Sequence, residues 1–212
     1  MLARTPSRNC RPDPRPHRDR AAGIARRLEA ADVASGLSLA RAKDHRAVRA
    51  LATASEIGSW KALFALSAGT LALGLTRGDR RLAGAGRAML AAGILASLVK
   101  TTLKRTVHRT RPNVLIDEGL YARGRPGTRK GPWQSFPSGH SALSVAVARA
   151  AARAYPEIGA AATAGAAGVI LVQVLRGAHF PADVLAGAAI GLAAEAVTHR
   201  CAGTEPALPV ER

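Results

Sequence analysis

Residues 82–101 read LAGAGRAMLAAGILASLVKT, a stretch of apolar and small residues in which only Arg87 and Lys100 carry a charge. An α-helix of about 20 predominantly apolar residues is long enough to cross the hydrocarbon core of a bilayer. This stretch therefore predicts a membrane-spanning helix, and it decides the class of fold to which the chain belongs.

Further apolar stretches lie on either side of it, at residues 60–76, 141–155, 157–175 and 184–199. Each is short and rich in Ala and Gly, so that one stretch alone also fits a buried helix of a soluble protein. Five stretches in succession favour membrane spans. We therefore expect an all-α fold, a polytopic transmembrane helical bundle of about five spans.

Gly187 and Gly191 in the last stretch form a Gly-x-x-x-Gly pair. Such a pair lets two helices approach closely in lipid, although a segment rich in Ala and Gly also produces it by chance. Both interpretations fit the sequence.

The segments outside the apolar region differ from it in composition. Residues 1–22 are rich in Arg and Pro, which predicts a disordered basic tail. Residues 23–58 predict a helical extension, which fits either an interfacial helix held by anionic lipid or a plain cytosolic helix. We expect residues 59–200 to form the membrane domain and residues 201–212 to form a C-terminal tail.

The charge balance limits the classes of partner. The chain has 31 Lys and Arg against 14 Asp and Glu, a net charge of +17, which suggests nucleic acid, an anionic membrane surface or a phosphorylated substrate. Aromatic residues make up only 3% of the chain, which disfavours the stacking that nucleic-acid binding often uses. Cys10 and Cys201 lie too far apart in the sequence to suggest a zinc site or a disulfide scaffold.

Reactive and cationic residues collect in two loops, one between the second and third predicted spans and one between the fourth and fifth. Both loops leave the membrane on the same side, so they are able to build one site. Lys104, Arg105, Arg109 and Arg111 lie in the first loop, although cations that flank a span also arise from the positive-inside rule. We interpret Arg105 and Arg109 as loop or headgroup charges rather than ligands of a phosphate.

Two histidines stand where helices are predicted to begin. Pro137 and Ser138 are typical helix-start residues, and the free N–H groups and dipole there favour an anion that His140 would face. His179 precedes a second predicted helix start, with Asp183 four residues later. A carboxylate beside one imidazole nitrogen fixes the tautomer and leaves the other nitrogen able to attack, but a single His–Asp pair is a weak signal.

Together these segments resemble the type 2 phosphatidic acid phosphatase family, which shares a superfamily with vanadium haloperoxidases. Its pattern is Lys-x6-Arg-Pro, then Pro-Ser-Gly-His, then Ser-Arg-x5-His-x3-Asp. The matching residues here are Lys104, Arg111 and Pro112, then Pro137, Ser138, Gly139 and His140, then His179 and Asp183. The chain departs from the pattern at Val172 and Gln173, where the family has Ser-Arg, and we hypothesise that Arg176 replaces the missing arginine.

The resemblance implies a membrane phosphatase that works without a metal ion or other cofactor, through a phosphohistidine. His179 would be the nucleophile, Asp183 would orient it, and His140 would be the general acid and base. The implied phosphate-binding residues are Lys104, Arg111, Ser138, Gly139 and Arg176. The implied substrate is a phosphomonoester or diphosphate of a phospholipid or polyprenyl carrier.

Two alternatives remain beside this interpretation: a vanadate-dependent haloperoxidase-like enzyme and a non-catalytic phospholipid-binding membrane protein. We expect the partners to be a phosphorylated lipid and the membrane, and not nucleic acid; the sequence does not specify an oligomeric state. The expected location is the bacterial inner membrane. With five spans, the positive-inside rule favours the cytoplasm for both the N-terminus and the catalytic loops.

Overall fold

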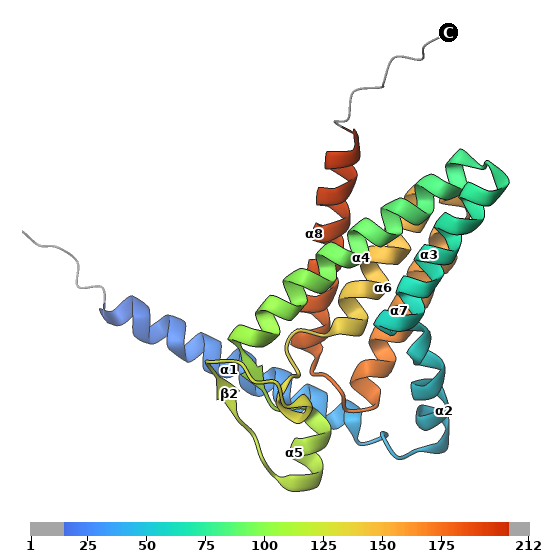
Figure 1. Cartoon of the computed structure of the whole chain (residues 1–212). Helices are drawn as coiled ribbons and strands as arrows, with labels where there is room; N and C mark the ends of the chain where they lie inside the picture. Colours follow the sequence, from blue (N-terminus) through green and yellow to red (C-terminus); the bar gives the residue numbers. More distant parts are fainter. Residues whose placement is uncertain (1–14, 204–212) are drawn as a thin grey trace, which may run out of the picture.

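The computed structural model describes residues 15–203, with side chains from residue 22 onward. Figure 1 shows a bundle of long helices with shorter elements gathered at one end. The helices are α1 (Arg15–Ala40), α2 (Arg46–Ala54), α3 (Trp60–Arg77), α4 (Arg80–Thr106), α5 (Pro112–Glu118), α6 (Gly139–Ala154), α7 (Gly159–Leu175) and α8 (Pro181–Gly203). Single 3-10 turns are η1 (Ser55–Gly58), η2 (Gly131–Trp133) and η3 (Pro156–Ile158), and strands β1 (His108–Arg109) and β2 (Arg123–Gly124) pair antiparallel.

The predicted helical bundle is confirmed, because each of the five apolar stretches corresponds to one helix of the bundle: α3, α4, α6, α7 and α8. Helix α6 is central and packs against α4, α7 and α8. Three helices are long and apolar enough to cross a membrane, and they span Arg80–Thr106, Pro156–Leu175 and Pro181–Ala202. The number of five spans stays a prediction, since α3 and α6 do not reach the same length and apolarity.

Polar side chains fix where the bundle helices begin. The Oγ of Ser59 accepts a hydrogen bond from the backbone N–H of Ala62 at the start of α3, and Asp79 does the same for Leu82 at the start of α4. Between these two helices, Gly78 takes a left-handed conformation with φ of 68°. Because glycine has no Cβ, it adopts this conformation without steric cost, and α3 and α4 form a tight hairpin.

The Gly-x-x-x-Gly pair is used inside this chain, where α8 lies against α6. A Cβ at Gly187 would lie 2.4 Å from the carbonyl oxygen of Ser138, and a Cβ at Gly191 would lie 2.4 Å from that of Ala142. Neither distance leaves room for a side chain. The two glycines therefore allow the backbones of α6 and α8 to touch, and this close approach holds the start of α6 beside the start of α8.

The N-terminal helices lie at the end of the bundle where the loops of interest emerge. Helix α1 crosses this end, and it contacts α5, α7 and α8 (Figure 1). It begins at Arg15, so the second part of the tail predicted for residues 1–22 is helical, whereas residues 1–14 and 204–212 lie outside the described residues. The extension predicted as a separate segment is thus packed against the bundle.

Candidate active site

A buried imidazole of the candidate site lies in the turn between α7 and α8. His179 is buried, with 3% of its surface exposed, and its Nδ1 lies 2.6 Å from the backbone oxygen of Ser135. A carbonyl oxygen only accepts, so Nδ1 carries the proton and donates it to Ser135. The lone pair then lies on Nε2, which is the tautomer that a nucleophile requires.

Cations from separate segments surround His179. The pKa of His179 lies well below its ordinary value, first because the ring is buried and then because of the positive charges of Arg111 and Lys104; the charge of His140 acts in the same direction. Lys104 binds the backbone oxygen of Gln134, and His179 binds that of the adjacent Ser135, so the two side chains lie in one small region. The structure therefore brings together residues from the ends of α4, α5, α6 and α7. Lys104 and His179, for example, are 75 positions apart in the sequence.

The two cations of the first motif are held by backbone groups. The Nζ of Lys104 donates to the backbone oxygen of Gln134 at 2.6 Å. Arg111 caps α5, and its backbone N–H donates to the oxygen of Pro132 at 3.0 Å. The Nε of Arg111 is buried and has no hydrogen-bond partner among the residues that the structure describes. An unpaired buried donor beside other cations is suited to an anionic ligand.

The Ser138–Gly139 step forms the start of α6. The Oγ of Ser138 lies 2.9 Å from the Oγ of Ser141 and accepts from its backbone N–H, while the N–H of Ser138 donates to the oxygen of Asp183. In both contacts the Ser138 oxygen is the acceptor, so it caps the helix while its own hydroxyl hydrogen remains able to donate to a ligand. A Cβ at Gly139 would lie 3.7 Å from the Nζ of Lys100, so this lysine also reaches the site. Lys100 was not predicted from the sequence, although it stands one helical turn before Lys104 and shares its face.

Asp183 does not orient His179 directly, and the predicted contact between them was wrong. Its carboxylate accepts from Arg109 Nη1 at 2.8 Å, from the Oγ of Ser135 at 2.5 Å and from the N–H of Phe180 at 2.9 Å. Within residues 15–203, no hydrogen bond joins Asp183 to the imidazole. Ser135 links the two instead, because its hydroxyl binds the carboxylate and its carbonyl holds His179.

Arg109 is a buried structural residue, so its interpretation as a loop charge was also wrong. It is 3% exposed, and besides Asp183 it binds Asp32 at 2.6 Å and Glu29 at 3.0 Å, both from α1. Its guanidinium lies over the ring of Phe180, 4.2 Å from the centroid. The three carboxylates are 74 to 80 residues away in the sequence, and no local spacing signals them.

The departure from the family pattern is visible at the end of α7. Gln173 is fully buried, and its Nε2 donates to the Oγ of Ser55 at 3.3 Å. Arg176 ends the helix, and its Nη1 donates to Glu56 at 2.9 Å. Burial lowers the pKa of Arg111, and the charge of Arg176 lowers it further, so Arg176 lies near the other cations. This position is compatible with the hypothesis that Arg176 replaces the missing arginine.

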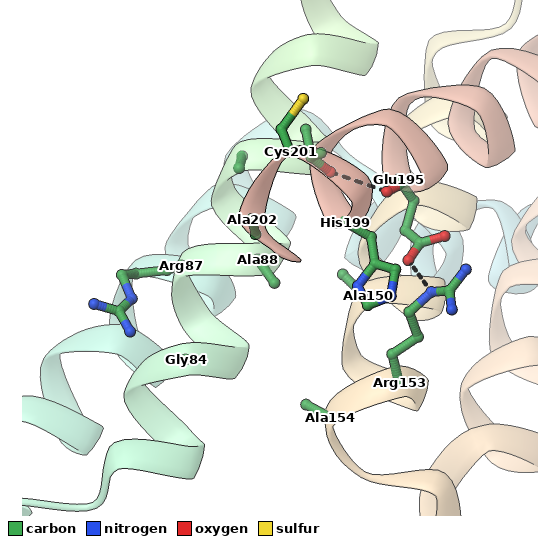
Figure 2. Close-up of a pocket in the computed structure, with 12 residues that line it drawn as sticks. Gly84, Arg87, Ala88, Ala150, Arg153, Ala154, Glu195, His199, Cys201 and Ala202 are labelled. Carbon is green, nitrogen blue, oxygen red and sulfur yellow. Dashed lines mark hydrogen bonds and ion pairs between the residues drawn. The ribbon is translucent and has the colours of Figure 1, made fainter. Parts of the chain in front are cut away.

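A larger hollow lies at the opposite end of the bundle (Figure 2). It is a cavity of about 780 Å³ between α4, α6 and α8, lined by five alanines and by polar residues that include Arg87, Arg153, Glu195, Thr198 and His199. Figure 2 shows Arg153 and Glu195 paired at its wall, while Arg87 points away. None of the residues predicted for catalysis lines this cavity, so its size does not mark the site.

Comparison with known proteins agrees with this arrangement. Residues 85–206 match the PAP2 superfamily, and the chain belongs to that superfamily. Its long apolar helices make it an integral membrane protein, in agreement with the transmembrane phosphatase that shares its fold.

Two curated relatives are lipid A 1-phosphatases. The one from Rhizobium johnstonii is 38% identical over 98 residues, which is 46% of this chain and 40% of the relative. The one from Rhizobium etli is 36% identical over 98 residues, which is 46% of this chain and 42% of the relative. The matched segment thus spans about two fifths of these relatives.

Two solved structures share the fold. The crystal structure of Aquifex aeolicus LpxE has a TM-score of 0.55 at 21% identity and covers 78% of this chain and 92% of its own. The transmembrane PAP2-type phosphatidylglycerolphosphate phosphatase of Bacillus subtilis has a TM-score of 0.62 at 20% identity, with coverages of 86% and 89%. Both likenesses concern the fold.

Proposed function

We propose that this chain is a membrane lipid phosphatase that hydrolyses a phosphomonoester or diphosphate of a phospholipid or polyprenyl carrier, without a metal ion, through a phosphohistidine. One observation carries the proposal: His179 holds its proton on Nδ1 against Ser135, and Lys104 and Arg111 stand around it. A neutral imidazole among fixed cations is the arrangement that attack on a phosphate needs.

In the proposed first step, the Nε2 of His179 attacks phosphorus in line with the bond to the lipid oxygen. Lys104, Arg111 and Arg176 hold the nonbridging oxygens, together with the N–H groups at the start of α6 around Gly139. These side chains and N–H groups are positioned before the substrate arrives, so they stabilise the charge of the transition state without reorganising. The P–O bond breaks as the P–N bond forms, and the lipid oxygen takes a proton from His140.

In the second step, His140 takes a proton from a water molecule, whose oxygen attacks the phosphohistidine. The P–N bond breaks, inorganic phosphate leaves and His179 is restored. Asp183 positions His179 indirectly in this scheme. Its carboxylate accepts a hydrogen bond from the Ser135 hydroxyl, and the backbone oxygen of Ser135 accepts one from Nδ1 of His179. Because the fixed cations supply the positive charge that a metal ion supplies in other phosphatases, we expect activity without one.

The relatives suggest a first substrate to try. Two of them are lipid A 1-phosphatases, which favours a phosphorylated saccharolipid with the phosphate at the bilayer boundary. The site lies at the ends of α4 and α8, two helices able to span a membrane, and a lipid headgroup reaches that depth without leaving the bilayer. We propose that the site faces the cytoplasm at the inner membrane. Labelling of an Arg125→Cys variant by an impermeant reagent in intact cells would contradict this location.

Phosphate release from a panel of lipids tests the proposal. The panel holds lipid A, phosphatidic acid, phosphatidylglycerol phosphate and a polyprenyl diphosphate, each with the purified chain in detergent. We expect phosphate release from at least one lipid, activity that resists a chelator, and inhibition by vanadate, which imitates the trigonal-bipyramidal transition state. A strict requirement for magnesium, or equal release by wild type and His179→Ala, would refute it.

A further inference from the structure

An acidic side chain stands among the cations of the site. One oxygen of Glu56 accepts from Nη1 of Arg176 at 2.9 Å, and the other lies 3.6 Å from Nε2 of His140. This Nε2 is buried and has no hydrogen-bond partner among the described residues. The hydrogen bond from Arg176 lowers the pKa of Glu56, so the carboxylate is ionised at neutral pH. Such a charge repels a phosphate, and its position beside a histidine therefore suggests a role in catalysis.

The segment that carries Glu56 is packed firmly against the bundle. Ser55 is 4% exposed and accepts the hydrogen bond from Gln173. A Cβ at Gly58 would lie 2.6 Å from Cγ1 of Val169 and 2.8 Å from the Oγ of Ser144. The turn η1 thus lies directly on α6 and α7, and its packing sets the place of Glu56.

The departure at Gln173 belongs to the same arrangement. Gln173 stands where the family pattern has an arginine, and its amide donates to Ser55, the neighbour of Glu56. Arg176, three residues on, is held by Glu56 itself. The loss of the family's arginine and the presence of the carboxylate are therefore parts of one local rearrangement.

His140 is otherwise surrounded by groups that oppose its charged form. Burial lowers its pKa, and the positive charges of Arg176 and Arg111 lower it further, whereas the carboxylate of Glu56 raises it. His179 lies within the influence of the same ring. A general acid must be protonated when the substrate binds, so His140 requires a counter-charge that the cations cannot provide.

We propose that Glu56 is the positioning residue of the general acid: its carboxylate holds Nε2–H of His140, so that Nδ1 faces the leaving oxygen of the substrate. This role depends on the phosphatase activity proposed above. The imidazolium gives its Nδ1 proton to the lipid oxygen as the P–O bond breaks. The neutral ring keeps its proton on Nε2, where the carboxylate of Glu56 accepts it as a hydrogen bond. The unprotonated Nδ1 then takes a proton from the water that hydrolyses the phosphohistidine.

Glu56→Gln tests the role, because it keeps the shape of the side chain and removes the charge. The matched control is Glu157→Gln, since Glu157 is also a half-exposed glutamate of a 3-10 turn paired with an arginine, Arg81, at the far end of the bundle. Both variants and wild type are assayed with an alkyl phosphate lipid, whose leaving oxygen needs a proton, and with p-nitrophenyl phosphate, whose leaving group needs none.

We expect Glu56→Gln to lower the first-turnover rate on the alkyl phosphate by about 100-fold and that on the aryl phosphate by less than about threefold. The basic limb of its pH profile should move to lower pH, because His140 loses its counter-charge. Glu56→Asp should recover part of the alkyl phosphate rate, and Glu157→Gln should behave as wild type.

Equal losses on the two substrates would overturn the role, since they would mean that Glu56 serves only the grip on phosphate or the fold. An unshifted basic limb would overturn it as well. If wild type is active and His179→Ala is not, while Glu56→Gln matches Glu157→Gln, then the role of Glu56 fails and the proposed phosphatase stands. A wild-type chain that releases phosphate from neither substrate would overturn both.

Discussion

The two ends of the bundle both contain buried charges, but they hold them differently. At the site end, Arg109 is bound by carboxylates from α1 and α8, and Asp183 is bound in turn by three donors. At the far end, Glu195 is 2% exposed and pairs with Arg153, and the Nε of Arg149 lies 3.9 Å from its carboxylate. Both arginines lie on one face of the neighbouring helix α6. The far end also has the cavity of about 780 Å³.

This difference separates two uses of polar residues in a membrane bundle. The far-end pair neutralises a carboxylate between two adjacent helices and leaves space beside it. The site end links segments far apart in the chain and leaves a buried donor, Nε of Arg111, without a hydrogen-bond partner among the described residues, whereas the unpartnered atom at the far end is an acceptor, Oε2 of Glu195. Buried polar groups are normally paired, so unpaired donors surrounded by a rigid network mark the place for a ligand better than volume does.

The largest contrast is expected between two histidines, one at each end. His179→Ala removes the proposed nucleophile and should lower kcat/KM for a lipid phosphate on the order of 10⁴-fold or more. His199→Ala, in the wall of the far cavity, should leave kcat/KM unchanged. Phosphate release by the two purified variants measures both. Comparable losses would mean that the two ends share the chemistry.

A second contrast concerns the two arginines that pair with glutamates near 3-10 turns. Arg176→Ala should lower kcat by about 10²–10³-fold, the usual effect of removing one preorganised donor to a developing charge. Arg81→Ala, which breaks the exposed pair with Glu157, should leave kcat as it is. Steady-state rates with a lipid phosphate compare them, and a near-normal Arg176→Ala would reject the replacement of the family's arginine.

A third contrast is one of stability. Arg109→Met leaves Asp183, Asp32 and Glu29 without their common cation, and we expect the free energy of unfolding to fall by about 3–5 kcal/mol. Arg153→Met should cost less, because its side chain is 41% exposed and Arg149 remains near Glu195. Thermal unfolding in detergent ranks the variants; the reverse order would show that the far-end pair is the more important one.

The smallest expected effect is the response of wild type to mild acid. Burial and nearby cations lower the pKa of His179, so its Nε2 stays unprotonated as the pH falls through the ordinary histidine range near 6.5. The acidic limb of kcat/KM should therefore lie below that range, so kcat/KM should not fall between pH 7 and 6 after correction for titration of the substrate. An acidic limb at or above pH 6.5 would contradict the burial of the imidazole as the controlling factor.

The sequence predicted the helices well because membrane spans are signalled locally, by length and apolarity. The stretch 82–101 lies within α4, and the motif residues Lys104, Arg111, His140 and His179 meet at one end of the bundle, as the loop order required. It failed where a partner comes from a distant segment. Arg109 looked like a flanking charge. Asp183 looked like the partner of His179 because it is only four positions away, whereas the actual partner Ser135 is 44 positions away.

The binding of α1 has a consequence for the smallest chain that folds. The region that matches the superfamily begins at residue 85, yet Asp32 accepts from the N–H of Ala182 at the start of α8 and also binds Arg109. A shortened chain that starts at Ser59 would keep every motif but lose Asp32 and Glu29, so that Asp183 alone would remain to balance the buried guanidinium of Arg109. We therefore expect the autonomous folding unit to be larger than the segment that matches the superfamily, and to reach back to Glu29.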